Sequence, residues 1–183
     1  MKRNIFRNTI VVFILIAIAS SCKKDVPPGG TAVQVMAGDW HVKVNDNSGY
    51  YITMYTFNTS DDSSTQMWLQ ANGLTSNNIH IPNPGGSASM PGLPIGVKGK
   101  VNVDVANQTF SGSNITNINS NATNVPTFSI ANGKVTSNGT VGPGSDSPAD
   151  LITFDLIVNG VTYKVSGYHR TGYLEDLPPS ERP

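Results

Sequence analysis

The fold is decided by residues 151–176, which read LITFDLIVNGVTYKVSGYHRTGYLED. Every second residue is apolar from Ile152 to Val158 and again from Val161 to Val165, which is the period of two of a β-strand. Asn159-Gly160 lies between these runs, and this pair accepts the positive φ angles at both central positions of a type I′ turn. The stretch therefore predicts a β-hairpin.

The same alternation recurs along the rest of the chain between short polar segments. It is clearest from Ile95 to Val105, where one face carries only apolar residues and glycine. Further strands are expected at residues 38–45, 50–58, 66–71, 109–112, 127–131 and 134–139. Asn132-Gly133 predicts a tight turn between the last two. About eight short strands with hairpin-length connections predict an all-β domain, either an antiparallel barrel or, alternatively, a β-sandwich.

A barrel of eight strands has an interior that side chains fill or that holds one small ligand. The residues expected to face and line that interior are Trp40, Val42, Met54, Met67, Leu69, Val101, Val103, Phe154, Leu156, Tyr163 and Val165. Methionine adapts its shape readily, so Met54 and Met67 suit a ligand pocket. Residues 82–94, PNPGGSASMPGLP, predict either a lid over such a pocket or a mobile surface loop, because proline and glycine interrupt regular structure.

The start of the chain resembles the signal and lipobox of a bacterial lipoprotein. Basic residues precede an apolar run of about ten residues, too short to span a bilayer, and small residues then lead into Cys22, the only cysteine. The resemblance implies cleavage before Cys22, a diacylglycerol on its sulfur and a fatty acyl chain such as palmitate on its amine, which together anchor a protein stably. An ordinary secretion signal followed by an unmodified cysteine is the alternative.

These signals divide the chain into four parts. Residues 1–21 are expected to be a lipoprotein signal peptide, 22–32 the lipidated cysteine and tether, 33–177 the β-barrel domain and 178–183 a tail. The implied location is the cell envelope, with a lipid anchor at the outer membrane, on either its periplasmic or its surface face.

Three motifs in the domain carry a family resemblance. They are Ala37-Gly38-Asp39-Trp40, Met67-Trp68-Leu69 and the run from Ser166 to Tyr173. They resemble a family of small Gram-negative lipoproteins described as lipid-binding putative hydrolases, over most of residues 36–176. The resemblance implies a calycin-like barrel that binds lipid, and the family name adds hydrolysis.

Gly38-x-Trp40 on a first strand, with Arg170 after a last strand, is also similar to the lipocalin arrangement. There the Trp closes one end of the barrel and the Arg lies over its ring. The resemblance implies a cation–π contact between Trp40 and Arg170, of about 0.5–2 kcal/mol. Strict alternation puts Arg170 on the face of Ser166, so this contact needs a bulge at Gly167. A buried Trp40 and a solvated Arg170 without contact are the alternative.

The sequence holds few candidates for catalysis. None of the common hydrolase, metalloprotease or nucleotide-binding motifs is present. His169 is a weak catalytic candidate with Glu175 and Asp176, because a His–carboxylate pair can activate a hydroxyl. Caps at a barrel end, or ion pairs with Arg170, are the preferred interpretation of these two carboxylates. His41 is expected to be solvated, and the histidine spacing fits no zinc site, so we expect no metal and no cofactor.

Three functions remain open. The preferred one is a binding module that holds a lipid or other small apolar molecule. A structural or glycan-binding envelope protein would show a flat platform of exposed rings such as Tyr50, Tyr51, Trp68 and Tyr168. A lipid or ester hydrolase would need a nucleophile beside a histidine.

The expected partners are the membrane, through the anchor, and a lipid or other apolar small molecule. After removal of residues 1–21, nine basic and twelve acidic residues remain. A net negative charge argues against a nucleic-acid partner, which would need a basic surface.

Overall fold

The computed structural model describes residues 29–45, 51–71, 96–119 and 125–182. The expected signal peptide, Cys22, Tyr50 and the expected lid at residues 82–94 lie outside these ranges.

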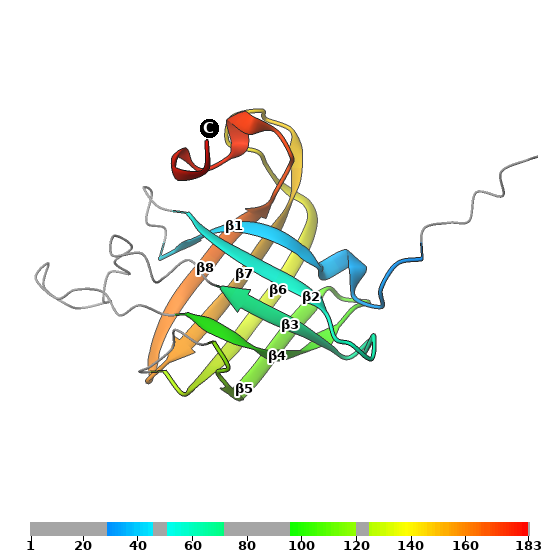
Figure 1. Ribbon diagram of the computed structural model, residues 1–183, viewed down its shortest axis with the longest axis vertical. Coiled ribbons are helices and arrows are strands. Elements are labelled where there is room, and N and C mark those ends of the chain that lie inside the picture. Colours follow the sequence, from blue (N-terminus) through cyan, green and yellow to red (C-terminus); the bar gives the residue numbers. More distant parts are fainter. Residues whose placement is uncertain (1–28, 46–50, 72–95, 120–124, 183) are drawn as a thin grey trace, which may run out of the picture.

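The described chain forms an up-and-down meander of strands (Figure 1). The strands are β1 (Gly38–Val44), β2 (Ile52–Asn58), β3 (Gln66–Ala71), β4 (Val97–Asp104), β5 (Thr109–Thr116), β6 (Thr127–Val141), β7 (Pro148–Val158) and β8 (Val161–His169). Each strand pairs antiparallel with the next, and β8 pairs with β1, so the sheet closes into a barrel. The prediction of an all-β antiparallel barrel is confirmed, because a sandwich would consist of two separate sheets.

Among the described residues, three short 3-10 turns flank the barrel. They are η1 (Gln34–Met36), η3 (Leu174–Asp176) and η4 (Pro179–Glu181). The last two belong to the C-terminal segment, residues 170–182, which turns back beside the barrel where β8 ends (Figure 1). Within the described ranges, no helix is long and apolar enough to cross a membrane.

The hairpin that decided the fold has the predicted geometry. Asn159 and Gly160 have φ angles of 50° and 79°, as a type I′ turn requires. Val158 pairs with Val161, and Phe154 pairs with Val165 further along the two strands. The alternation therefore places one apolar face of this hairpin inside the barrel.

The tight turn predicted at Asn132-Gly133 is wrong. β6 continues through these residues, and its pairing with β7 shifts between Ala131 and Lys134, which is the mark of a β-bulge. Asn132 has a φ of 53°, and its side-chain amide donates a hydrogen bond to Asp155 Oδ2 at 2.8 Å. Residues that accept positive φ serve bulges as well as turns, so the local sequence alone does not distinguish the two.

The interior of the barrel is an apolar core. All the residues predicted to face it belong to one buried cluster, and none exposes more than 9% of its surface. The rings of Phe110 and Phe154 also meet there, with centroids 5.7 Å apart. Burial of such side chains contributes roughly 1.5–3 kcal/mol each to folding, so this core is the main stabilising element of the domain.

One end of the barrel is closed by η1 and the first strand. Met36 and Trp40 expose 0% and 1% of their surfaces. The indole N–H of Trp40 donates to the hydroxyl of Thr56 at 2.8 Å, and this hydroxyl donates to the carbonyl of Met36 at 2.6 Å. Every polar atom in this buried chain has a partner, which is the condition for closing an apolar end with a Trp.

Candidate functional site

Trp40 packs against His169. The resemblance to lipocalins predicts this contact for the next residue, Arg170. Trp40 and His169 are paired in the β1–β8 register, so both side chains lie on the inner face, with ring centroids 5.0 Å apart in an edge-to-face arrangement. Gly38 makes room for this contact, because a Cβ there would lie 2.2 Å from Nε2 of His169. The side chain of Arg170 is exposed. Its backbone N–H donates a hydrogen bond to the carbonyl of Asp39 at 2.8 Å.

The predicted cation–π contact is therefore replaced by a ring contact. Within the described residues, no cation–π contact involves Arg170; those present join Lys43 to Tyr51 and two other lysines to Trp68. The alternation of β8 continues to its end without the bulge that the contact needed, so Arg170 points outward.

The weak catalytic candidates do not come together. His169 faces the barrel interior beside Trp40, whereas Glu175 is exposed and Asp176 is buried in the C-terminal segment. In the described part of the chain, no hydrogen bond or ion pair joins His169 to either carboxylate. The same part of the chain contains no group of three or more His, Cys, Asp or Glu side chains that could hold a metal ion.

Asp176 instead fastens the C-terminal segment to the turn between β6 and β7. Its Oδ1 accepts the backbone N–H groups of Gly144 at 2.8 Å and Ser145 at 2.7 Å. Its Oδ2 accepts the hydroxyls of Ser145 at 2.6 Å and Thr171 at 2.5 Å. Burial alone would raise the pKa of Asp176, but the hydrogen bonds from Ser145, Thr171 and Gly144 outweigh it and hold the pKa at about 2. The carboxylate is therefore ionised at neutral pH and acts as a clamp.

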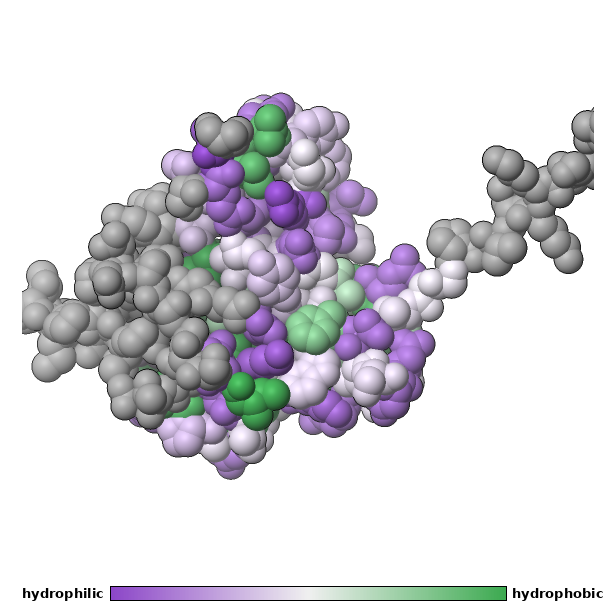
Figure 2. All heavy atoms as spheres, viewed as in Figure 1, coloured by the Kyte–Doolittle hydropathy of each residue, from purple (hydrophilic) through white to green (hydrophobic). Residues whose placement is uncertain are grey.

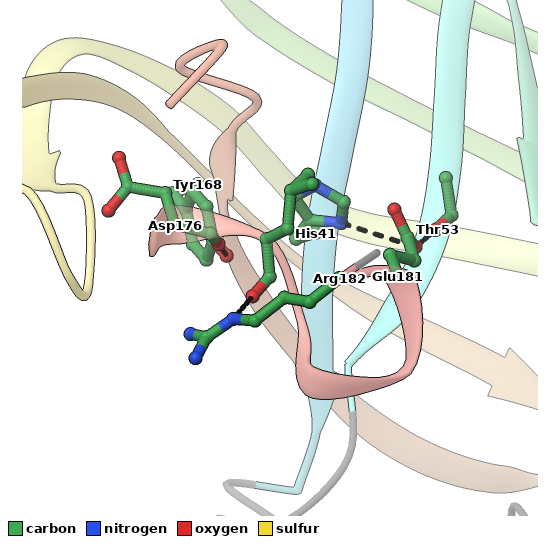
Figure 3. Close-up of polar contacts among 7 residues, drawn as sticks. His41, Thr53, Tyr168, Asp176, Glu181 and Arg182 are labelled. Carbon is green, nitrogen blue, oxygen red and sulfur yellow. Dashed lines mark hydrogen bonds and ion pairs between the residues drawn. The ribbon is translucent and has the colours of Figure 1, made fainter. Parts of the chain in front are cut away.

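A second polar cluster lies beneath the C-terminal segment (Figure 3). His41 points outward from β1, yet it exposes only 1% of its surface, so the expectation of a solvated side chain is wrong. Its ring lies 5.3 Å from the ring of Tyr168 on β8, and its Nδ1 lies 3.8 Å from Oε1 of Glu181. The same Glu181 oxygen accepts the hydroxyl of Thr53 at 2.6 Å. Residues 170–182 fold over this face, which no local pattern around His41 could reveal.

His41 is buried without hydrogen bonds. Neither ring nitrogen has a hydrogen-bond partner among the described residues. Burial lowers the pKa of His41 below its ordinary value of 6.5, and the carboxylate of Glu181 opposes this only in part. The ring is therefore neutral at pH 7, and its contact with Glu181 is not an ion pair there.

Tyr168 ties the same face to the C-terminal segment. Its hydroxyl donates a hydrogen bond to the backbone carbonyl of Asp176. Burial, followed by the charges of neighbouring groups, raises the pKa of Tyr168, so this hydroxyl keeps its proton and remains a donor. Arg182 completes the segment by donating from Nε to the carbonyl of Leu177 at 2.9 Å.

Pockets formed by described residues include three that open on the barrel wall. One of about 570 Å³ lies over β4, β5 and β6, and one of about 350 Å³ lies over β3, β4 and β5. The third, of about 520 Å³, lies over β8 and is bounded by β1 and by the ends of β6 and β7. We call it the β8 groove and define it by Lys43, Tyr51, Val141, Leu151 and Ser166 with Tyr168.

On the outer face of β8, the sequence pattern suggests a role only for Tyr168, as one ring of a possible glycan-binding platform. Outward positions on a strand read as solvated when only the alternation is considered. The place of Lys43 and Val141 in the β8 groove follows from the β1–β8 pairing and from the course of the β6–β7 turn. Neither of these is a local signal in the sequence. By contrast, the eleven predicted interior residues do come together in the core. Their role in lining a ligand stays a prediction.

Replacement of Asp176 by alanine should lower the free energy of unfolding by about 2–4 kcal/mol, because it leaves four partly buried donors without their charged acceptor. The carboxylate stabilises the fold fully above its ordinary pKa of 3.8, and this contribution should disappear as the pH falls toward 2. Urea unfolding at pH 7 and pH 3 measures both effects. Glu175→Ala is the matched control, since that neighbouring side chain is exposed. Equal losses in the two variants would contradict the clamp.

His41 should make the fold sensitive to mild acid. The unfolded chain takes up a proton at His41 near pH 6.5, whereas the folded chain resists it, so stability should fall as the pH drops below 6.5. Urea midpoints at pH 7.5, 6.5 and 5.5 should show a smaller fall in His41→Leu than in the parent chain. Glu181→Gln should show a larger fall, because it removes a charge that favours the protonated ring. An unchanged pH dependence in both variants would contradict this assignment.

Comparison with known proteins gives one family. The chain matches the family described as "Lipid-binding putative hydrolase" over residues 25–174, a range that contains all eight strands. No curated protein matches the chain. Similar solved structures include a redesigned beta barrel, with 21% sequence identity, coverage of 78% of this chain and 96% of that chain, and a TM-score of 0.40. Another is the redesigned beta barrel mFAP1 bound to DFHBI, with 21% identity, coverage of 77% and 100%, and a TM-score of 0.37. Because the family match spans most of its length, the chain belongs to the Lipid-binding putative hydrolase family.

Proposed function

We propose that this protein is a lipid-anchored protein of the cell envelope whose barrel domain binds a lipid or other small apolar molecule. The observation that carries the proposal is the family match, which covers the whole closed barrel from before β1 to beyond β8. The lipobox-like sequence that ends at Cys22 supports the anchor and the outer-membrane location. The match begins at residue 25, so the lipid-binding family domain would follow the anchor almost directly.

Binding has more support than hydrolysis. A hydrolase needs a nucleophile within reach of a general base. In the described part of the chain, the hydroxyls of Ser145 and Thr171 donate to Asp176, and His169 packs against Trp40. These groups have structural partners, and none of these contacts forms a nucleophile–base pair.

A glycan-binding surface has less support than lipid binding. Tyr168 is buried beneath the C-terminal segment, exposing 5% of its surface, so it joins no platform. Trp68 stacks with Phe57, with ring centroids 6.4 Å apart, but the ammonium groups of Lys98 and Lys100 lie 6.0 and 5.4 Å from the Trp68 ring. This side of the barrel, over β2, β3 and β4, is mostly hydrophilic and weakly apolar, with one strongly hydrophobic spot at its lower edge (Figure 2).

Lipid binding is tested by native mass spectrometry of residues 23–183, which lack the anchor. We expect a bound species that organic solvent extracts, and its return when the extracted protein is incubated with an envelope lipid extract. A chain that stays free of bound mass both after gentle purification and after this incubation would overturn the lipid-binding proposal.

The anchor is tested separately by growth of a Gram-negative host with an alkyne-tagged palmitate. The full chain should carry the tag and fractionate with membranes, whereas Cys22→Ser should lose both properties. Circular dichroism of the variant should still show the β-sheet signal, because Cys22 lies outside the barrel strands. Tag retained by Cys22→Ser would contradict lipidation at this residue.

A further inference from the structure

The β8 groove is a concavity with a floor and two walls. Ser166 and Tyr168 project outward from β8 and form the floor, and Lys43 with Tyr51 forms the wall on the side of β1. Leu151 on β7 continues into the opposite wall. Its volume of about 520 Å³ lies within the range of small-molecule sites, roughly 300–1,000 Å³.

The wall opposite β1 is raised by the end of β6 and held in place. The pairing of β6 with β7 shifts between Thr136 and Thr140, so the strand end bends away from the regular sheet. The turn after β6 is bonded to Asp176 through Gly144 and Ser145. Figure 1 shows this connection beside the C-terminal segment, beyond the end of β8. The groove is therefore part of the folded architecture, since the clamp fixes the wall.

The surface of the groove is apolar along the raised wall. Val141 exposes 48% of its surface there, and Pro143 and Leu151 lie beside it. The rings of Tyr51 and Tyr168 meet edge to face with centroids 5.4 Å apart and extend this apolar surface toward β1. An aliphatic chain laid in the groove would remove the exposed surfaces of Val141 and Pro143 from water, which is favourable at roughly 25 cal/mol per Å², whereas Tyr168 is already buried.

Among its described residues, the groove also carries one uncompensated positive charge. Lys164 is paired, because its Nζ lies 2.7 Å from Oδ1 of Asp155. Lys43 makes no ion pair within the described ranges, and its Nζ lies 4.7 Å from the centroid of the Tyr51 ring. The exposed hydroxyl of Ser166 supplies a further hydrogen-bonding group. A cation such as Lys43 beside an apolar wall complements a ligand with a single negative charge on an apolar body.

We propose that the β8 groove, on the outer wall of the barrel, binds a long-chain carboxylate, with its carboxylate at Lys43 and its chain along Val141 and Leu151. The proposal rests on the lipid-binding function proposed above and gives that function a site and a head group. The barrel interior, where the sequence pattern predicts the ligand, then serves as the apolar core that holds the walls of the groove.

Photolabelling of the purified full chain in a non-ionic detergent tests this site. The probes are a long-chain fatty acid with a diazirine in its chain and the matching fatty alcohol. We expect the acid to label peptides that contain Lys43, Val141 or Leu151 and to label them more than the alcohol does. Lys43→Gln should reduce labelling by the acid about tenfold, the size of one lost charge-assisted hydrogen bond, and should leave labelling by the alcohol unchanged.

Two further variants keep the test independent of folding. Lys98→Gln removes an outward lysine on β4, away from the groove, and should change labelling less than twofold. Val141→Glu places a negative charge on an already exposed position and should reduce labelling by the acid as strongly as Lys43→Gln. Circular dichroism checks that each variant keeps the barrel.

The outcomes separate the two proposals. Labelling of the groove that is equal for acid and alcohol, or unchanged in Lys43→Gln, would overturn the head-group assignment. Labelling confined to peptides elsewhere in the chain would overturn the site and leave the lipid-binding function standing. If neither probe labels the chain and native mass spectrometry finds no bound lipid, both proposals fail.

Discussion

Backbone pairing between β1 and β8 is the interaction on which the rest of the structure depends. It turns an open meander into a closed barrel, and a closed barrel has no unpaired sheet edge. Its register places His169 opposite Trp40 on the inner face and Tyr168 opposite His41 on the outer face. The same pairing brings Lys43 beside Ser166 and so creates the floor and one wall of the β8 groove. Interior closure, the buried histidine and the groove are thus consequences of one register.

The C-terminal segment converts part of the outer wall into a second buried layer. Asp176 holds it to the β6–β7 turn, Tyr168 bonds to its backbone, and Glu181 reaches Thr53 on β2. A small barrel gains stability from such a layer without enlarging its core. The layer also buries polar groups, each of which needs a hydrogen-bond partner. Among the described side chains, only His41 has buried polar atoms without such a partner.

Most of the fold could be predicted from the alternation of apolar and polar residues along the chain. Alternation around Asn159-Gly160 identified the final hairpin, and alternation elsewhere identified the inward residues, because burial on one face imposes a period of two. The pattern did not distinguish a bulge from a turn at Asn132-Gly133, since both need the same backbone angles. It could not show that residues 170–182 would cover His41, because that contact joins distant parts of the chain. The sequence predicts Asp176 to be a barrel-end cap, a partner of Arg170 or a weak catalytic residue, and only its hydrogen-bond partners identify it as a clamp.

Closure by the first and last strands also sets the order in which this protein can fold. Trp40 pairs with His169, close to the two ends of the domain, so the contact that completes the barrel has one of the largest sequence separations available. Contacts of this kind slow folding, because the chain loses the entropy of a long loop before the pairing stabilises it. Until β8 has emerged from the ribosome, β1 lacks its second neighbour and the barrel cannot close. A chain that stays open until its last strand arrives acquires its rigidity only at that step.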